Sequence, residues 1–441
     1  MGSLNRRRFL TTSATAAGVL AFGAGRAAAR PAPPVEVAAL GPDFLWGVAS
    51  SGFQSEGRAP DSNWTRYIAA GKTEDPYLDS VDFYTRYRSD VELAAELGVR
   101  VYRIGIEWAR VQPRPGEWDE NGFRFYDDVI GAIRAAGMRP MLTLDHWVYP
   151  GWEFDRGGWR RAGMVDDWLA NARTVVDRYA PHDPLWITFN EPAAYLMNEA
   201  RHGGIGVIDI PAVQDRMAAA HNAVYDHIHQ VQPGAMVSSN VPYIPTAEDV
   251  VNGAFLDRIG AKIDYVGIDY YYGFSPESVL AQFPDPGKLW TLSLQSEGIY
   301  YALDHYARRF PGKPLYIVEN GMPTENGRPR ADGYTRADLL RDTVYWLQRA
   351  AADGMNLMGY NYWSLTDNYE WGSYTPRFGL YTVDVRNDPG LTRRRTDAVA
   401  AYTAITRAGG VPGDYRPTRA PARCSIADGL ASCTDQVTVP R

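Results

Sequence analysis

Two glutamates stand at the ends of apolar, β-branched segments, in settings that suit acid–base and nucleophilic chemistry. Glu191 lies in the string Thr188–Pro192 (TFNEP), and Glu319 lies in Tyr316–Gly321 (YIVENG). In a barrel of parallel strands, side chains at the C-terminal strand ends face one pocket even when they are far apart in sequence. Paired carboxyl groups flanking one bond are what glycoside hydrolysis requires, because one protonates the leaving oxygen and the other attacks or activates water. The pair therefore predicts a site that cleaves glycosidic bonds.

Eight strand-like segments alternate with helical ones between residues 41 and 410. This alternation is typical of a parallel sheet with crossover helices, and Gly98, Gly137 and Gly354 stand where helices should stop before the next strand. The pattern predicts an α/β fold, a single (β/α)8 TIM barrel. The expected strands are Phe44–Ala49, Arg100–Ile106, Arg139–His146, Leu185–Glu191, Ala235–Asn240, Asp264–Tyr271, Pro314–Asn320 and Leu357–Trp363, and the clearest helices are Tyr84–Leu97, Gly122–Ala136, Met164–Tyr179, Asp215–Gln230 and Ala337–Asp353.

Polar and aromatic side chains gather at the C-terminal ends of these strands. Inward positions elsewhere on barrel strands are usually branched and apolar, so this concentration at one end indicates a site. A single member, Asn240 above all, is equally well explained as a satisfied core group, but the set is not. Its members are Gln54, Arg103, Glu107, His146, Asn190, Glu191, Asn240, Tyr271, Glu319 and Trp363.

The composition argues against several classes of protein. A formal net charge of −7 provides no basic surface for nucleic acid. Seven histidines without a His-x-x-x-His pair, and no cysteine in the main domain, argue against a metal centre, and no cofactor is expected. Aromatic residues make up 12 % of the 441 residues. They suit stacking on the apolar faces of sugar rings, and filling a large core is the alternative for any one of them.

The two ends of the chain predict short appendages to one catalytic domain, residues 41–410. Residues 1–29 resemble a twin-arginine export signal, with Asn5–Leu10 (NRRRFL) followed by an Ala- and Gly-rich stretch. That stretch is short and mildly apolar beside the roughly 20 residues of a spanning helix, so no stable membrane span is expected, and an anchor is the alternative. We expect a secreted or cell-envelope protein that is exported folded. Residues 30–40 are interpreted as a linker.

Residues 411–441 are expected to form an irregular tail that contains several prolines. Cys424 and Cys433 are the two cysteines of the chain, and both lie in this tail. Outside the cell they are able to form a disulfide, which would clamp the tail locally.

The order of the motifs resembles glycoside hydrolase family 1, the β-glucosidase type, from Phe44 to about Thr403. A lone Asn-Glu-Pro string also occurs in other barrel glycosidases, whereas the full series in this order is specific. The matching segments are Phe44–Gly47 with Gln54–Gly57, Tyr102–Arg103, Thr143–Trp147 with Pro150, Thr188–Pro192, Val266–Tyr271, Val318–Gly321, and Tyr362–Trp371 with Arg377–Gly379.

The resemblance implies a retaining double displacement, with Glu319 as nucleophile and Glu191 as general acid and later base. Arg103 and Tyr271 would contact Glu319, and the guanidinium would keep that carboxylate ionised, whereas Glu191 needs a raised pKa to arrive protonated. Asn190 would hold the sugar 2-hydroxyl. Alternatives remain for single residues, with Arg103 as a plain barrel ion pair and His146 as a core histidine. The sugar-binding residues implied are Gln54, His146, Asn190, Tyr271, Trp363, Glu370 and Trp371, with Trp363 as the stacking floor.

The implied substrate is a small-molecule β-glycoside or oligosaccharide. Glu370 favours free 4- and 6-hydroxyls, because a carboxylate accepts hydrogen bonds from hydroxyls and repels phosphate. Terminal β-glucose is the first choice, followed by β-galactose and β-fucose. A transglycosylase would use the same covalent intermediate. A catalytically inactive sugar-binding barrel is the third reading, although such proteins lack one of the two glutamates.

Three positions depart from the family pattern. Asp269 stands where the family usually has Asn, Asp145 stands where an aromatic or His is more usual, and Glu107 stands where many members have Ser. A carboxyl group at 269, close to Glu319, is expected to raise the pKa of one of the two groups, and so to affect the pH optimum. Segments 57–78 and 197–214 are short for the family, which would open the aglycone side of the site.

Overall fold

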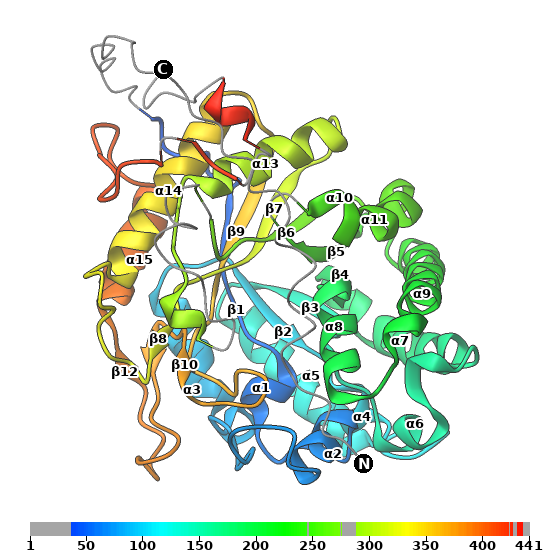
Figure 1. Ribbon diagram of the computed structural model, residues 1–441. Coiled ribbons are helices and arrows are strands. Elements are labelled where there is room, and N and C mark those ends of the chain that lie inside the picture. Colours follow the sequence, from blue (N-terminus) through cyan, green and yellow to red (C-terminus); the bar gives the residue numbers. More distant parts are fainter. Residues whose placement is uncertain are drawn as a thin grey trace, which may run out of the picture.

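Eight parallel strands close into a barrel with helices around it (Figure 1). The computed structural model describes residues 37–244, 247–273, 275, 288–422, 424–426 and 430–434. Strands β1 to β7 follow one another around the barrel, and β9 closes it by pairing with both β7 and β1. The predicted (β/α)8 barrel is confirmed. Its strands are β1 (Leu45–Ala49), β2 (Val101–Gly105), β3 (Arg139–Asp145), β4 (Leu185–Asn190), β5 (Met236–Pro242), β6 (Val266–Asp269), β7 (Leu315–Asn320) and β9 (Leu357–Trp363).

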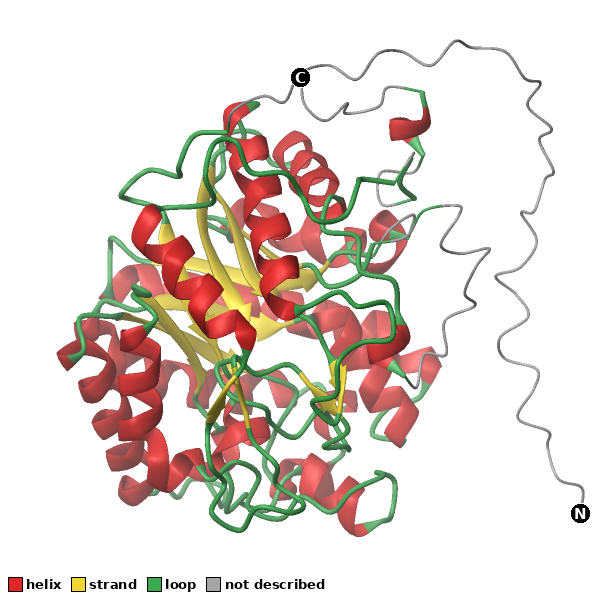
Figure 2. Cartoon of the chain, turned by 90° about the vertical axis from the view of Figure 1, so that its left-hand side faces the viewer, coloured by secondary structure: helices red, strands yellow, loops and turns green. Residues whose placement is uncertain are grey.

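Helices lie outside these strands, as Figure 2 shows in red around the yellow sheet. The α-helices are α1 (Gly52–Glu56), α2 (Asn63–Ala69), α3 (Phe83–Glu96), α4 (Trp108–Val111), α5 (Glu120–Ala135), α6 (Gly151–Arg156), α7 (Met164–Tyr179), α8 (Pro192–His202), α9 (Ile210–Val231), α10 (Glu248–Val251), α11 (Gly253–Ile259), α13 (Gly298–Arg309), α14 (Arg336–Ala352) and α15 (Asp397–Ala408). Short 3₁₀ turns are η1 (Gly158–Arg160), η2 (Ala180–His182), η3 (Val207–Asp209), η4 (Gly260–Lys262), η5 (Leu289–Thr291) and η6 (Ala431–Cys433). Two small antiparallel pairs join β8 (Thr324–Glu325) with β10 (Pro376–Arg377), and β11 (Tyr381–Thr382) with β12 (Arg394–Arg395).

The observed elements agree with the predicted ones to within about two residues at most ends. The largest difference among the helices is α9, which begins at Ile210 instead of Asp215. Pro211 occupies its first turn, where the missing N–H is harmless and the fixed φ suits a helix. Strand β6 is shorter than predicted, because the pairing with β7 becomes irregular after Ile268 and the following tyrosines leave the sheet.

The core has two layers, separated by the barrel wall. A large cluster fills the space between strands and helices and includes Trp168, Phe189 and Tyr402. A smaller cluster takes the alternate residues of the strands, among them Val101 and Met141, and fills the barrel interior. The interior below the strand ends is therefore packed, and the open positions lie at the C-terminal ends.

Irregular pairing re-aims the side chains at the ends of three strands. The register shifts between Ile187 and Asn190 on β4, between Ile268 and Asp269 on β6, and between Ile317 and Asn320 on β7. Such bulges bend a strand and turn its following side chains to a new direction. The residues re-aimed here include those that carry the predicted chemistry.

The tail packs along one side of the barrel and contains a disulfide. Cys424 is bonded to Cys433. Upstream of it, the backbone N–H of Ala422 donates to Glu297, and the hydroxyl of Tyr415 donates to Asp342 on α14.

At the other end, the chain is described from residue 37, within the segment expected to be a linker. Val37 and Leu40 are buried, and the N–H of Leu40 donates to the carbonyl of Gly409. The export signal expected in residues 1–29 lies outside the described residues and stays a prediction. Within the described part of the chain, no helix combines the length and apolarity that crossing a bilayer demands.

Candidate active site

Glu191 sits at the junction between β4 and α8. It is the N-cap of α8 with a left-handed backbone (φ 40°), and Pro192 follows as the first helical residue. The N–H of Glu191 donates to the carbonyl of Asn240 at 3.0 Å, and its own carbonyl accepts from Tyr195 at 2.9 Å. These bonds fix the backbone on both sides of the turn. The Glu191 carboxyl group is thereby held at the strand end by a rigid element.

Glu319 is the penultimate residue of β7 and is surrounded by donors. It forms a buried ion pair with Nη1 of Arg103, and it accepts a hydrogen bond of 2.7 Å from the Tyr271 hydroxyl. The Glu319 side chain is about 6 % exposed, and Arg103 is fully buried. A cation and a hydroxyl on the two carboxylate oxygens suit a group that must act as an anion. Both contacts expected of Glu319 are present.

Arg103 links the two glutamate-bearing strands. Its Nη2 donates to Oδ1 of Asn190 at 2.7 Å, and its Nε donates to the Thr143 hydroxyl at 2.9 Å. Three of its nitrogens therefore have defined partners on β3, β4 and β7. A guanidinium held this way is a positioning device for the site as well as a counter-ion.

Glu191 differs from Glu319 in its electrostatic surroundings. Burial and the charge of Glu319 together raise the pKa of the Glu191 carboxyl to about 8, although Arg103 opposes the shift. At neutral pH Glu191 therefore carries a proton that it is able to give away. The two carboxyl groups thus differ in the way that an acid and a nucleophile must differ.

Polar side chains from the β1 and β9 ends form a second group. Gln54 on α1 donates through Nε2 to Glu370 and to Asn368, both at 3.2 Å. The indole N–H of Trp363 donates to the other oxygen of Glu370 at 3.1 Å. Burial raises the pKa of Glu370 to about 8 as well. The cluster offers donors and acceptors that suit neighbouring hydroxyl groups.

Aromatic rings build a wall beside this polar group. Trp371, whose φ is 45°, stacks on Trp147 with ring centroids 4.5 Å apart and lies 5.7 Å from His146. His146 in turn stacks on Trp363 at 5.8 Å. The indole N–H of Trp147 donates to the carbonyl of Asn190 at 2.8 Å, which ties the wall to β4. Flat apolar faces next to hydroxyl partners are what a pyranose ring needs.

His146 has one nitrogen available for a ligand. Burial and the charge of Arg103 hold its pKa well below the usual value, so the imidazole is neutral. Its Nδ1 is buried and has no hydrogen-bond partner in the described part of the chain. An unpartnered polar atom in a ring packed against Trp363 and Trp371 is a natural partner for a substrate hydroxyl.

The three departures from the family pattern lie in different surroundings. Asp145 accepts from the backbone N–H of Trp147 and from the indole of Trp168, both at 3.0 Å. Glu107 accepts from the N–H of Phe53 at 2.9 Å, behind α1. Both therefore act as buried supports of the wall around the site. Asp269 is different, because it ends β6 opposite Glu319 in the strand register.

The structure brings all the predicted site residues to one end of the barrel. The Arg103 network joins Glu319, Tyr271 and Asn190, and the Gln54 group joins Glu370, Trp363 and His146. A small apolar cluster of Ala49, Trp363 and Phe378, with Tyr271 packed against it, connects the two groups.

Three participants were not singled out from the sequence. Thr143 receives the Nε hydrogen bond of Arg103, Asn368 receives one from Gln54, and Trp147 supports Asn190. Each lies within one of the motifs that resemble the family, so these motifs were the sequence signal that could have found the three residues. Their partners depend on tertiary contacts that spacing along the chain does not show.

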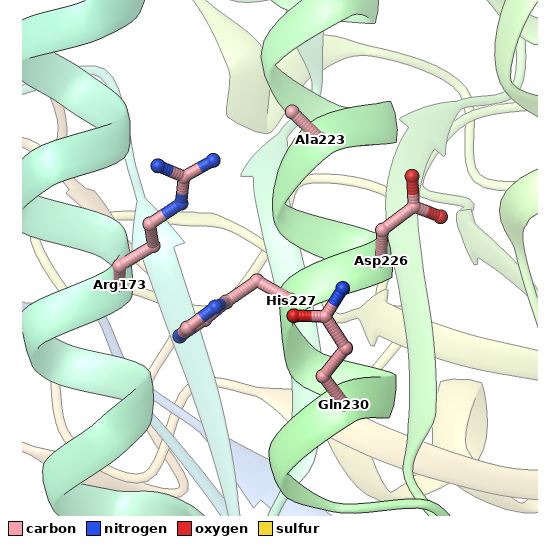
Figure 3. A pocket seen from close by; sticks show the side chains of 5 residues that line it. All are labelled: Arg173, Ala223, Asp226, His227 and Gln230. Carbon is pink, nitrogen blue, oxygen red and sulfur yellow. The ribbon is translucent and has the colours of Figure 1, made fainter.

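Other parts of the described chain show no comparable chemistry. No group of three or more His, Cys, Asp or Glu side chains that could hold a metal ion occurs among the described residues. A surface hollow of about 540 Å³ lies between α7 and α9 and is lined by Arg173, Ala223, Asp226, His227 and Gln230 (Figure 3). It lies on the helical exterior, away from the paired carboxyl groups at the strand ends.

Comparison with known proteins identifies the family. The model of glycosyl hydrolase family 1 matches residues 37–241 and 276–411. A 1,4-β-D-glucan glucohydrolase of Thermotoga neapolitana is 26 % identical over 420 residues, covering 77 % of this chain and 97 % of that protein. The galactolipid galactosyltransferase SFR2 of Arabidopsis thaliana is 27 % identical over 401 residues, covering 80 % of this chain and 62 % of that longer protein.

Solved structures agree with this comparison. The family 1 β-glucosidase from Thermotoga maritima has a TM-score of 0.74 at 25 % identity, covering 85 % of this chain and 99 % of that one. The β-glycosidase from Pyrococcus horikoshii has a TM-score of 0.73 at 26 % identity, covering 86 % and 96 %. The family match spans well over half of the chain and includes both glutamate motifs. The chain therefore belongs to glycosyl hydrolase family 1, and it is a β-glucosidase-like glycoside hydrolase.

Proposed function

We propose that this protein is a retaining β-glycosidase in which Glu319 is the nucleophile and Glu191 is the general acid and base. The observation that carries the proposal is the contrast between the two glutamates. Glu319 is paired with Arg103 and Tyr271, whereas burial and the charge of Glu319 raise the pKa of Glu191 to about 8. One carboxyl is held as an anion and the other holds a proton, as double displacement requires.

In the first step, Glu319 attacks the anomeric carbon while Glu191 protonates the departing glycosidic oxygen. The C–O bond to the aglycone breaks, and an ester bond to Glu319 forms. Esterification removes the negative charge that had raised the pKa of Glu191, so this pKa falls. Glu191 then accepts a proton from water, which attacks the anomeric carbon and releases the sugar.

The remaining side chains of the site would bind the terminal sugar. Gln54, Glu370 and the free nitrogen of His146 would engage hydroxyl groups, and Trp363 would lie under the ring. Asn190 is oriented by Arg103 and would hold the 2-hydroxyl, where hydrogen bonding strengthens as the transition state forms. Terminal β-glucose is the preferred glycone, with β-galactose and β-fucose as further candidates.

Product stereochemistry tests the mechanism directly. Hydrolysis of an aryl β-glucoside is followed by proton NMR during the first minutes, before the released sugar mutarotates. The β-anomer is expected as the first product, because two inversions restore the configuration. Release of the α-anomer first would contradict the double displacement.

Transglycosylation is a second candidate, favoured by the likeness to a plant protein named as a galactolipid galactosyltransferase. The same ester would be resolved by a sugar hydroxyl in place of water. Adding a glycoside acceptor during hydrolysis distinguishes the two activities. A transglycosylase would form new oligosaccharides at acceptor concentrations where a hydrolase would still release mainly free sugar.

A further inference from the structure

Three carboxyl groups at strand ends surround Arg103, apart from Glu370 on the other side of the site. Glu191, Asp269 and Glu319 lie at the ends of β4, β6 and β7, and all interact with Arg103. Glu319 takes the ion pair. An additional unpaired carboxylate in a buried site is strongly unfavourable, and such a group becomes neutral by binding a proton. The charge balance therefore requires a proton on Glu191 and a proton on Asp269. For Glu191 the role as general acid already requires one.

The orientation of Asp269 follows from a chain of hydrogen bonds that begins at Arg103. A guanidinium only donates, so the atom of Asn190 that faces Arg103 must be its carbonyl oxygen, Oδ1. The same oxygen accepts from Asn240 at 2.6 Å, which makes the facing atom of Asn240 its amide nitrogen. That nitrogen also donates to Oδ2 of Asp269. Oδ2 is therefore an acceptor, and a proton on this carboxyl group must reside on Oδ1.

Oδ1 of Asp269 is placed where such a proton is needed. It is buried, and no N–H or O–H donor reaches it within the described residues. Asp269 as a whole is 1 % exposed. Glu191 lies close enough to Asp269 for the two carboxyl groups to interact. Two carboxylates cannot form a hydrogen bond with each other, because neither has a hydrogen to donate.

We propose that Asp269 is protonated in the resting enzyme and is a positioning residue for Glu191, to which its carboxylic acid O–H donates. This inference rests on the proposed role of Glu191 as acid and base. A neutral aspartic acid has nearly the shape of asparagine, with an O–H in place of the N–H₂ group. The protonated side chain thus fills the position where the family usually has Asn, and it supplies the same donor.

The electrostatic surroundings agree with this geometry. Burial raises the pKa of Asp269 well above its usual value, and the charges of Glu319 and Glu191 raise it further. Arg103 opposes the shift from β2, and Tyr271 also interacts with Asp269. The expectation that a carboxyl group at 269 raises the pKa of one member of the Asp269–Glu319 pair is confirmed for Asp269.

A shared proton distinguishes this chain from a relative with Asn at the same position. Glu191 and Asp269 titrate as a pair, and the active form holds two protons. Loss of the second proton would remove the donor to Glu191 and add a charge beside the nucleophile. An amide at position 269 has no such ionisation.

Carbon-13 NMR of protein labelled at the aspartate side-chain carboxyl detects the protonation of Asp269 without relying on activity. Asp269→Asn assigns the resonance by its disappearance. We expect that resonance at the position of a protonated carboxyl group at pH 7, with a titration midpoint above 7. The resonance of Asp145, another buried aspartate whose pKa burial raises, is retained in the variant as an internal reference. A resonance of Asp269 that is already ionised at pH 5 would overturn the proposal, whether or not the protein hydrolyses glycosides.

Activity as a function of pH provides the second test, with two variants of similar size. Asp269→Asn keeps a donor towards Glu191, whereas Asp269→Leu removes it, so Asn is expected to retain about tenfold more kcat/KM than Leu at pH 6. The alkaline limb of log kcat/KM should approach a slope of two in the wild type and of one in Asp269→Asn. Equal losses of kcat/KM in both variants, together with an alkaline slope in Asp269→Asn that equals the wild-type slope, would show that Asp269 acts as an anion. Failure of the proposed function would appear separately, in the stereochemistry of the product.

Discussion

Arg103 bonds to Glu319 through one terminal nitrogen and to Asn190, the neighbour of Glu191, through the other. One buried cation therefore holds the two carboxyl-bearing strands in register at their C-terminal ends. It also favours the charge on Glu319, while Glu191 has no direct ion pair with it in the described structure. The difference between the acid and the nucleophile arises from this asymmetry.

Replacing the nucleophile should abolish turnover with little effect on folding. Glu319→Gln keeps an oxygen for Tyr271 but cannot form the ester, so we expect kcat to fall by roughly 10⁴-fold or more. Initial rates on an aryl β-glucoside measure the loss, and circular dichroism during heating checks the fold. Glu92→Gln, an exposed residue of α3, serves as the control and should keep wild-type rates.

Replacing the acid should affect substrates according to their leaving group. Glu191→Gln cannot donate a proton, so alkyl glucosides should lose a further 10²- to 10⁴-fold, roughly, relative to a dinitrophenyl glucoside that needs no protonation. Azide should restore turnover and give a β-glucosyl azide, because it attacks the ester without a base. Equal losses for both leaving groups would assign Glu191 another role.

The pH profile should have an alkaline limb to which the ionisation of Glu191 contributes. Its pKa is raised to about 8, and the protonated form is the active one, so kcat/KM should fall as the pH rises above 8. The charge of Glu319 contributes to this shift, so Glu319→Gln should lower the pKa of Glu191. Carbon-13 NMR of labelled glutamate side chains measures that pKa in both proteins, and a pKa that is the same in both would contradict the coupling.

Glu370 should determine how the outer hydroxyls of the sugar are recognised. Glu370→Gln replaces one carboxyl oxygen with an amide NH₂ while keeping an oxygen for the Trp363 indole, and we expect kcat/KM on β-glucosides to fall about tenfold or more. A β-fucoside, which lacks the 6-hydroxyl, should lose less than a β-glucoside. Steady-state rates on matched aryl glycosides give the comparison, and identical losses would place the 6-hydroxyl elsewhere.

A buried ion pair outside the site should dominate the stability of the β11–β12 region. Arg393 holds both oxygens of Asp90 on α3 at 2.8 Å, and both side chains are almost fully buried. Arg393→Ala leaves an unpaired buried carboxylate and should lower the free energy of unfolding by about 3–5 kcal/mol. Arg395→Ala breaks the exposed pair with Glu96 and should cost about 1 kcal/mol or less. Urea unfolding of both variants provides the comparison.

The barrel and its paired glutamates were predictable because their signals are local. Strand and helix periodicity gave β9 and α7 with their observed bounds, and the Asn-Glu and Glu-Asn strings marked two strand ends. The partners of Arg103 on β3 were not predictable in this way. Thr143 resembles any β-branched strand residue until the barrel closes and brings it to the guanidinium.

Asp269 shows the same limit for electrostatics. Its type was noticed in the sequence, but its proposed protonation depends on burial, on the hydrogen bond from Asn240 and on the charges of Glu191 and Glu319. Each of these is a property of the assembled strand ends. Sequence alone identified the position, and the three-dimensional arrangement gave it a role.

Retaining hydrolysis requires a covalent bond between Glu319 and the sugar. Intact-protein mass after incubation with 2-deoxy-2-fluoro-β-glucosyl fluoride tests this bond, since the 2-fluorine slows both steps while the fluoride leaving group keeps formation of the ester faster than its breakdown. We predict one adduct, mapped to the peptide that contains Glu319 and absent in Glu319→Gln. An adduct on a different residue, or none while aryl β-glucosides are still hydrolysed, would contradict Glu319 as the nucleophile.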